Sequence, residues 1–157
     1  MNKQAGISLI EIMVTLFIAS LLLAYGIPNF KDFLLRQSVT TKANDMLVDF
    51  VFARSEAINR GIPVSISANP TWDQGWQVAT DFNGNGTFDG NDEIIRIANK
   101  IEAKINLVDA LGDGIPIIFG VTGDLMSAAS RQITIKHTDI SQQKVLTIAL
   151  SGSISAR

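Results

Sequence analysis

A long apolar segment near the N-terminus constrains this chain more than any other feature. Residues 7–27 read ISLIEIMVTLFIASLLLAYGI and contain a single charged residue, Glu11. As an α-helix that rises about 1.5 Å per residue, this segment spans roughly 30 Å, which is the thickness of a bilayer's hydrocarbon core. A short leader with Lys3 and Gly6 precedes it, and no small-x-small cleavage site of a secretory signal follows it. The pattern predicts a membrane-spanning helix with a cytoplasmic N-terminus.

Glu11 is the costly residue of this segment, because an unpaired carboxylate in hydrocarbon is unfavourable by at least about 2.5 kcal/mol. A cut between Gly6 and Ile7 would give Ile7 a free ammonium group one helical turn from Glu11. The carboxylate could then pair with its own amine or with that of a neighbouring chain. It would also lie in the first turn, where the helix dipole favours an anion. The sequence therefore predicts an assembly role for Glu11 rather than a plain anchor.

The leader, Gly6, the apolar Ile7, Glu11 and the long apolar helix together resemble the class III signal of type IV pilins and pseudopilins. The resemblance implies that a prepilin peptidase cuts between Gly6 and Ile7 and then methylates the new amine of Ile7. It also implies that Glu11 forms an assembly salt bridge in the filament. Ile7 departs from the family pattern, in which phenylalanine is usual at the first mature position.

The helix is expected to continue well beyond the membrane. Gly26 and Pro28 predict a bend, since proline removes a helical hydrogen bond. Beyond them the pattern becomes amphipathic, and Gly61 is a typical end signal, so we expect one helix over residues 8–60. Its predicted apolar face includes Ala43, Leu47, Phe50, Val51, Ala57 and Ile58, whereas charged residues such as Asp45 and Asp49 are expected on the polar side.

From Pro63 onward the apolar residues alternate with a period of two, and turns rich in glycine and asparagine separate the runs. This predicts about six or seven mostly antiparallel strands and an α+β fold, in which a long N-terminal helix packs on a C-terminal β-sheet domain. The predicted parts are a leader (1–6), a transmembrane and assembly helix (7–28), the amphipathic half of the helix (29–61) and a β-rich periplasmic domain (62–157).

Three further stretches are similar to the GspH/FimT group of minor pilins and pseudopilins: DMLVDFVFARSEAINRGIPVSI, GWQVATDFNGNGTFDGNDEIIR and LTIALSGSISAR. This resemblance implies the type IV pilin-like fold and a structural subunit anchored in the inner membrane, with its C-terminal domain in the periplasm before it enters a pilus or pseudopilus. Its partners would be the prepilin peptidase and other major and minor pilins or pseudopilins. The leading interpretation is a minor pilin that initiates a type IV pilus or sits at its tip.

Two alternatives stay open, an H-type pseudopilin of type II secretion and a minor pilin that binds DNA in natural transformation. For the second, the candidate residues are Arg131, Lys136, Lys144 and Arg157, although ordinary charges on the solvent face of strands are the favoured interpretation of these residues. The Gly-Arg-x-Arg tail expected of DNA-uptake members is broken here, because Ser153 follows Gly152. The net charge of -2 gives no global basic field.

An oxygen-rich stretch over residues 81–93 is the candidate cofactor site. The spacing of its polar residues follows the EF-hand calcium loop, with a glycine at the sixth position; the candidate ligands are Asp81, Asn83, Asn85, Asp89 and Asp92. The alternative is a long hairpin turn, since Asn, Asp and Gly are also the residues that such turns need.

The remaining composition excludes several classes of site. There is no cysteine and only one histidine, so disulfides, thiolate zinc sites and histidine-rich metal sites are excluded. No nucleophile–base pair stands out, and we predict no catalysis. We expect His137 at the surface, and of Trp72 and Trp76 one in the core and one over a loop edge.

Overall fold

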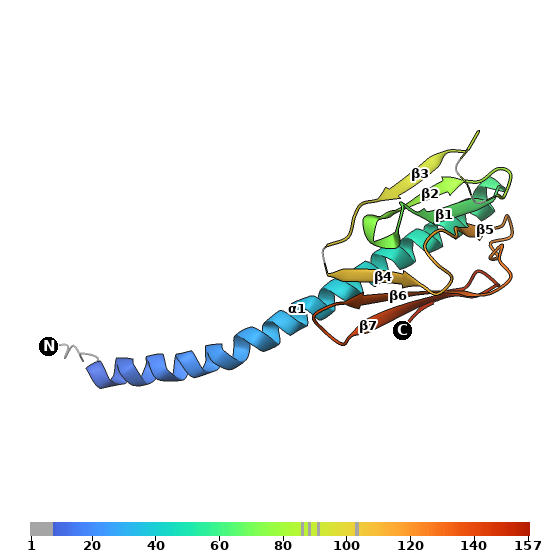
Figure 1. Ribbon diagram of the computed structural model, residues 1–157. Coiled ribbons are helices and arrows are strands. Elements are labelled where there is room, and N and C mark those ends of the chain that lie inside the picture. The colour runs from blue at the N-terminus through green and yellow to red at the C-terminus, as the bar shows by residue number, and fades with distance from the viewer. Residues whose placement is uncertain (1–7, 86, 88, 91, 103) are drawn as a thin grey trace. The chain divides into compact units, whose positions relative to one another are not determined.

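The computed structural model describes residues 8–85, 87, 89–90, 92–102 and 104–157 (Figure 1). The chain divides into two compact units, residues 1–35 and residues 36–157. One helix, α1 (Leu9–Arg60), runs through 52 residues and belongs to both units. The expected helix over residues 8–60 therefore agrees with the structure to within one residue.

In the described part of the first unit, the apolar side chains of α1 are exposed, including Phe17 at 65% and Leu22 at 69%. The helix continues through Gly26 and Pro28 without ending. Near Pro28, which has no N–H to donate, the Asn29 side-chain amide donates to the carbonyl of Tyr25 at 2.8 Å. The bend predicted at Gly26 and Pro28 stays a prediction.

Among its described residues, the second unit adds eight strands to the C-terminal part of α1, with a short 3₁₀ turn η1 (Trp72–Gln74) between the first two. The strands are β1 (Val64–Ala68), β2 (Trp76–Thr80), β3 (Ile94–Ala98), β4 (Ile105–Asp109), β5 (Ile117–Phe119), β6 (Arg131–His137), β7 (Gln143–Ile148) and β8 (Ile154–Ala156).

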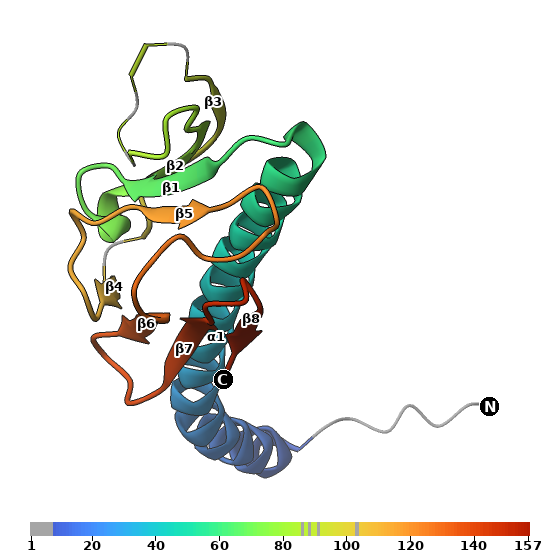
Figure 2. The same ribbon diagram turned by 90° about the vertical axis from the view of Figure 1, so that its right-hand side faces the viewer.

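These strands form two four-stranded antiparallel sheets, in the orders β3-β2-β1-β5 and β4-β6-β7-β8 (Figure 2). The antiparallel α+β fold is confirmed, but the expected number of six or seven strands is too low. The strand that was not predicted is β4. Its sequence does not alternate between apolar and polar residues, because the buried position 109 is an aspartate and position 108, which is 47% exposed, is a valine.

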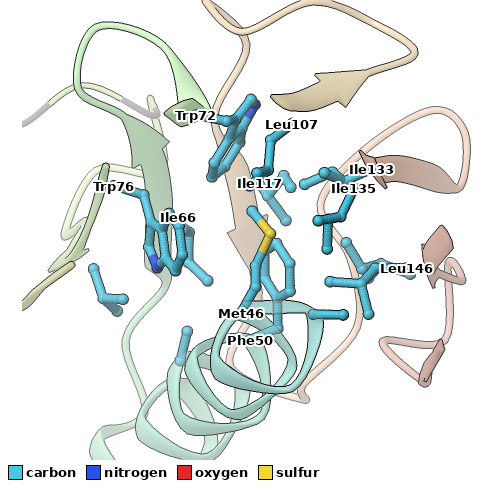
Figure 3. Close-up of a cluster of buried hydrophobic side chains, with 14 of the residues drawn as sticks. Met46, Phe50, Ile66, Trp72, Trp76, Leu107, Ile117, Ile133, Ile135 and Leu146 are labelled. Carbon is cyan, nitrogen blue, oxygen red and sulfur yellow. The ribbon is translucent and has the colours of Figure 1, made fainter. Parts of the chain in front are cut away.

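One face of α1 supplies the centre of the core. Met46 and Phe50 point between residues of the two sheets, with Ile66 on one side and Leu146 on the other (Figure 3). The apolar residues that this face buries recur at three- and four-residue steps: Val39, Ala43, Met46, Phe50, Ala53 and Ala57. The predicted face is partly wrong, since Val51 and Ile58 are each 49% exposed.

Arg54 ties two loops to this helix. Its Nε donates to the carbonyl of Gly123 at 2.7 Å, and its Nη2 donates to the carbonyl of Ser151 at 3.3 Å. Gly152 is required beside these contacts, because its φ is +74° and a Cβ there would lie 1.8 Å from the Gly123 oxygen. Arg54 thus holds the loop before β8 against α1.

We predict that Gly152→Ala destabilises the fragment of residues 29–157 by roughly 2–4 kcal/mol, because an added Cβ displaces the Gly123 backbone. A thermal melt should show a midpoint lowered by roughly 10 °C. Gly114→Ala is the matched control, since nothing lies within 4 Å of a Cβ at that position. Equal melting points for the two variants would contradict this account of Gly152.

Candidate functional site

The N-terminal site centres on Glu11, since the predicted cleavage residues Gly6 and Ile7 lie outside the described residues. Glu11 is in the first turn of α1, and its backbone N–H donates to the carbonyl of Ser8 at 3.1 Å. Within residues 8–157 as the structure describes them, no hydrogen bond or ion pair involves the Glu11 carboxylate. An exposed carboxylate at this position is available to a cation from another chain or from the N-terminal residues.

The N-terminal part of α1 is suited to an apolar environment. The hydroxyl of Thr15 donates to the Ile12 carbonyl at 2.8 Å, and that of Ser20 donates to the Phe17 carbonyl at 2.7 Å. Both hydroxyls are therefore satisfied within the helix, as hydrocarbon requires. By length and composition α1 is able to cross a membrane, with a mean hydropathy of 2.2 in its most apolar window and none of that window buried.

The oxygen-rich stretch is the loop between β2 and β3, so strands flank it as expected (Figure 1). The Asp89 carboxylate links the middle of the loop, because it accepts hydrogen bonds from the side-chain amides of Asn85 at 2.9 Å and of Asn83 at 3.3 Å. Asp92 closes the loop by accepting from the backbone N–H groups of Phe82 at 2.9 Å and of Asp89 at 3.0 Å.

Asp81 lies at the start of this loop and is fully buried, with its Oδ1 accepting from the Asn85 backbone N–H at 3.0 Å. The structure thus connects all five predicted ligands in one hydrogen-bonded loop. Donation by Asn85 is the main reason that the pKa of Asp89 is lowered, so this carboxylate stays ionised. Among the described residues no three acidic or histidine side chains form a metal-sized group, so a calcium ion would need amide oxygens.

Arg131, a candidate DNA contact, is buried, with 1% of its surface exposed. Its Nη2 pairs with the Asp109 carboxylate and donates to the Ile115 carbonyl at 2.9 Å. Its guanidinium therefore holds β4 and the loop after it, and it does not reach a phosphate at the surface. The expectation of a solvent-facing Arg131 is wrong because this position of β6 points into the core.

The other three candidates are not gathered on one face of the sheet. Lys144 pairs in register with Ile135, which is fully buried, so Lys144 belongs to the inward face of β7. Lys136 is the next residue of β6 and faces the opposite way. Arg157 exchanges two backbone hydrogen bonds with Val145, the neighbour of Lys144 in β7. Only Lys136 and Arg157 are on the outward face.

The expectations for the aromatic and histidine side chains are also corrected. Trp72 and Trp76 are both buried, at 0% and 3% exposure, so neither covers a loop edge from outside. His137 is buried at 6% exposure, because it belongs to the inward set of β6, and its Nδ1 accepts from the Asp139 backbone N–H at 3.1 Å.

A polar cluster between α1 and β3, centred on the buried Asp49, was not predicted from the sequence. Asp49, expected on the polar side of the helix, is 4% exposed. Its carboxylate accepts from Trp76 Nε1 at 2.8 Å, and Arg96 Nε lies 2.8 Å from its other oxygen. The available signal was spacing, since Asp49 falls one turn after Met46 and one turn before Ala53, both on the buried face.

Comparison with known proteins agrees with these features. Residues 42–153 match the family model of the type II transport protein GspH, and residues 1–26 match that of the prokaryotic N-terminal methylation motif. A fimbrial protein of Pseudomonas aeruginosa is 30% identical over 115 residues, which is 71% of each of the two chains.

Two kinds of solved structure share the fold. The crystal structure of the type IV minor pilin FimU of Pseudomonas aeruginosa has a TM-score of 0.64 at 21% identity, covering 80% of this chain and 92% of that one. The minor pseudopilin EpsH from the Type 2 Secretion System of Vibrio cholerae has a TM-score of 0.58 at 12% identity, covering 76% and 96%. These likenesses confirm the type IV pilin-like fold.

If the loop over residues 81–92 is a calcium site rather than a hairpin turn, we predict weak binding, with a dissociation constant of roughly 0.1–1 mM, as in extracellular calcium modules. Calorimetry of the fragment of residues 29–157 titrated with CaCl₂ measures this, and Asp89→Asn should abolish the heat. Asp124→Asn, an exposed carboxylate in another loop, should leave it unchanged. An unmodified fragment that gives no heat at several millimolar calcium would leave the loop as a hairpin turn.

Proposed function

We propose that this chain, which belongs to the GspH family of type IV pilins and pseudopilins, is a minor pilin that helps to initiate a type IV pilus or sits at its tip. Members of this family are structural subunits rather than enzymes. The single observation that carries the proposal is an exposed carboxylate, Glu11, in the first turn of an otherwise apolar helix that follows a methylation motif.

The proposed sequence of events begins in the inner membrane. Prepilin peptidase cuts between Gly6 and Ile7 and methylates the amine of Ile7, while the β-rich domain of residues 62–157 lies in the periplasm. On assembly the exposed apolar side chains of α1 leave lipid and pack against neighbouring pilin helices. Glu11 then pairs with a terminal amine, which offsets the roughly 2.5–3.5 kcal/mol that an unpaired charge in an apolar surrounding costs.

We prefer a pilus because a relative at 30% identity is a fimbrial protein, although the family model that matches residues 42–153 is that of the type II transport protein GspH. The fold shared with a minor pseudopilin keeps the H-type pseudopilin of type II secretion as the second candidate. Deleting the chain's gene separates them, since the first role predicts loss of surface pili and the second predicts loss of protein secretion. No observation favours the DNA-binding alternative, because Arg131 is buried and Lys144 and Lys136 belong to opposite faces of their sheet.

N-terminal processing is the direct test of the proposal. Mass spectrometry of the protein from cells with an active prepilin peptidase should find a chain that begins at a methylated Ile7. Deleting the peptidase should leave the leader attached. An intact leader in the cells with active peptidase would overturn the proposal.

Glu11→Ala should be processed normally yet enter filaments about tenfold less, because the terminal amine loses its carboxylate partner. The measurement is the ratio of the variant in sheared filaments to the variant in membranes, by immunoblot. Glu102→Ala, an exposed carboxylate in the second unit, is the control and should not change this ratio. Normal incorporation of Glu11→Ala would show that the pairing argument is wrong.

A further inference from the structure

The outer edge of β3 is open for pairing. Among the described residues β3 is hydrogen-bonded to β2 alone and ends its sheet (Figure 2). Alternate backbone N–H and C=O groups of such an edge point away from the sheet. Its sequence, IIRIA, contains no lysine or proline, its one charged residue is Arg96, and Ile97 is 60% exposed.

A groove runs beside this edge, between β3 and α1. It has a volume of about 370 Å³ and is lined by Asp49, Trp76 and Ile97, among others. The charged residues in its lining are Lys42, Asp45, Asp49, Arg96 and Lys100, so cations exceed carboxylates by one. This excess favours an acidic occupant over a basic one.

The Arg96 side chain is fixed in position by its neighbours but remains partly accessible to an anion. Its Nε is engaged by the buried Asp49, which Trp76 fixes in turn, and its guanidinium lies 5.6 Å from the centre of the Phe52 ring. The side chain is nevertheless 45% exposed. A guanidinium has five N–H donors, and an Arg whose position is already fixed loses little conformational entropy when it binds a carboxylate.

Lys100 supplies the unpaired charge. It is exposed, follows β3 closely in the chain and lines the groove. Within the described part of the chain no carboxylate forms an ion pair with Lys100, whereas Lys42 is paired with Asp45 at 3.3 Å. An incoming carboxylate would therefore meet Lys100 without displacing an existing partner.

We propose that the β3 edge and this groove together dock an extended, carboxylate-bearing segment of a different pilin that neighbours this chain in the filament. The segment adds a strand to β3, places an apolar side chain on Ile97 and directs a carboxylate between Arg96 and Lys100. Extended peptides commonly bind open sheet edges in this way, with backbone bonds giving affinity and side-chain contacts giving specificity. This docking rests on the proposed function, because it needs a neighbouring subunit.

The test uses the full-length chain in cells that assemble the filament. A photo-crosslinking amino acid replaces Ile97 in one strain, Val51 on the exposed side of α1 in a second, and Val108 on the other sheet in a third. Mass spectrometry identifies the peptides that are captured. We expect position 97 to capture an acidic segment of another pilin, and Lys100→Glu to lower that yield about five- to tenfold. Lys136→Glu should leave the yield unchanged, since Lys136 lies on β6.

The outcomes separate this docking from the filament role itself. Capture of pilins at position 51 but not at position 97 overturns the docking and leaves the filament role standing. Capture of pilins at none of the three positions overturns both. Three other outcomes also overturn the docking. They are capture of a second copy of this chain at position 97, equal capture at positions 97 and 108, and a crosslinking yield that Lys100→Glu leaves unchanged.

Discussion

The burial of one face of α1 between Val39 and Ala57 is the constraint on which the β domain depends. Neither four-stranded sheet closes on itself, and each needs an apolar layer to cover its inner face. Met46 and Phe50 provide that layer for both sheets at once (Figure 3). The small Ala43, Ala53 and Ala57 let the strands and loops approach the helix closely.

The same helix meets a different requirement before residue 36. There its large apolar side chains are exposed, so they require lipid or other helices around them. In that setting Glu11 needs a cationic partner, which the proposed N-terminal processing would supply. A single helix therefore has an apolar part that is long enough to cross a membrane and a second part that forms the core of a domain.

The polar contacts of the second unit mostly position backbone rather than carry chemistry. Arg131 holds the loop after β4, Arg54 holds the loop before β8, and Asp92 closes the loop after β2. Arg96 differs from these, because its partner Asp49 is buried while the guanidinium itself remains half exposed. That difference is why the β3 edge, and not the basic residues of β6 and β7, is the surface we propose for a partner.

The sequence by itself determined the long helix, the methylation motif, the place of Glu11 and the antiparallel strands, because each depends on local spacing along the chain. Only the tertiary structure decided that Arg131 and His137 are buried, that β4 exists and that the strands split into two sheets. The reason is that burial of a polar residue depends on a distant partner. Arg131 is paired with Asp109, and Asp49 accepts a hydrogen bond from Trp76. Periodicity along the chain does not reveal either partner.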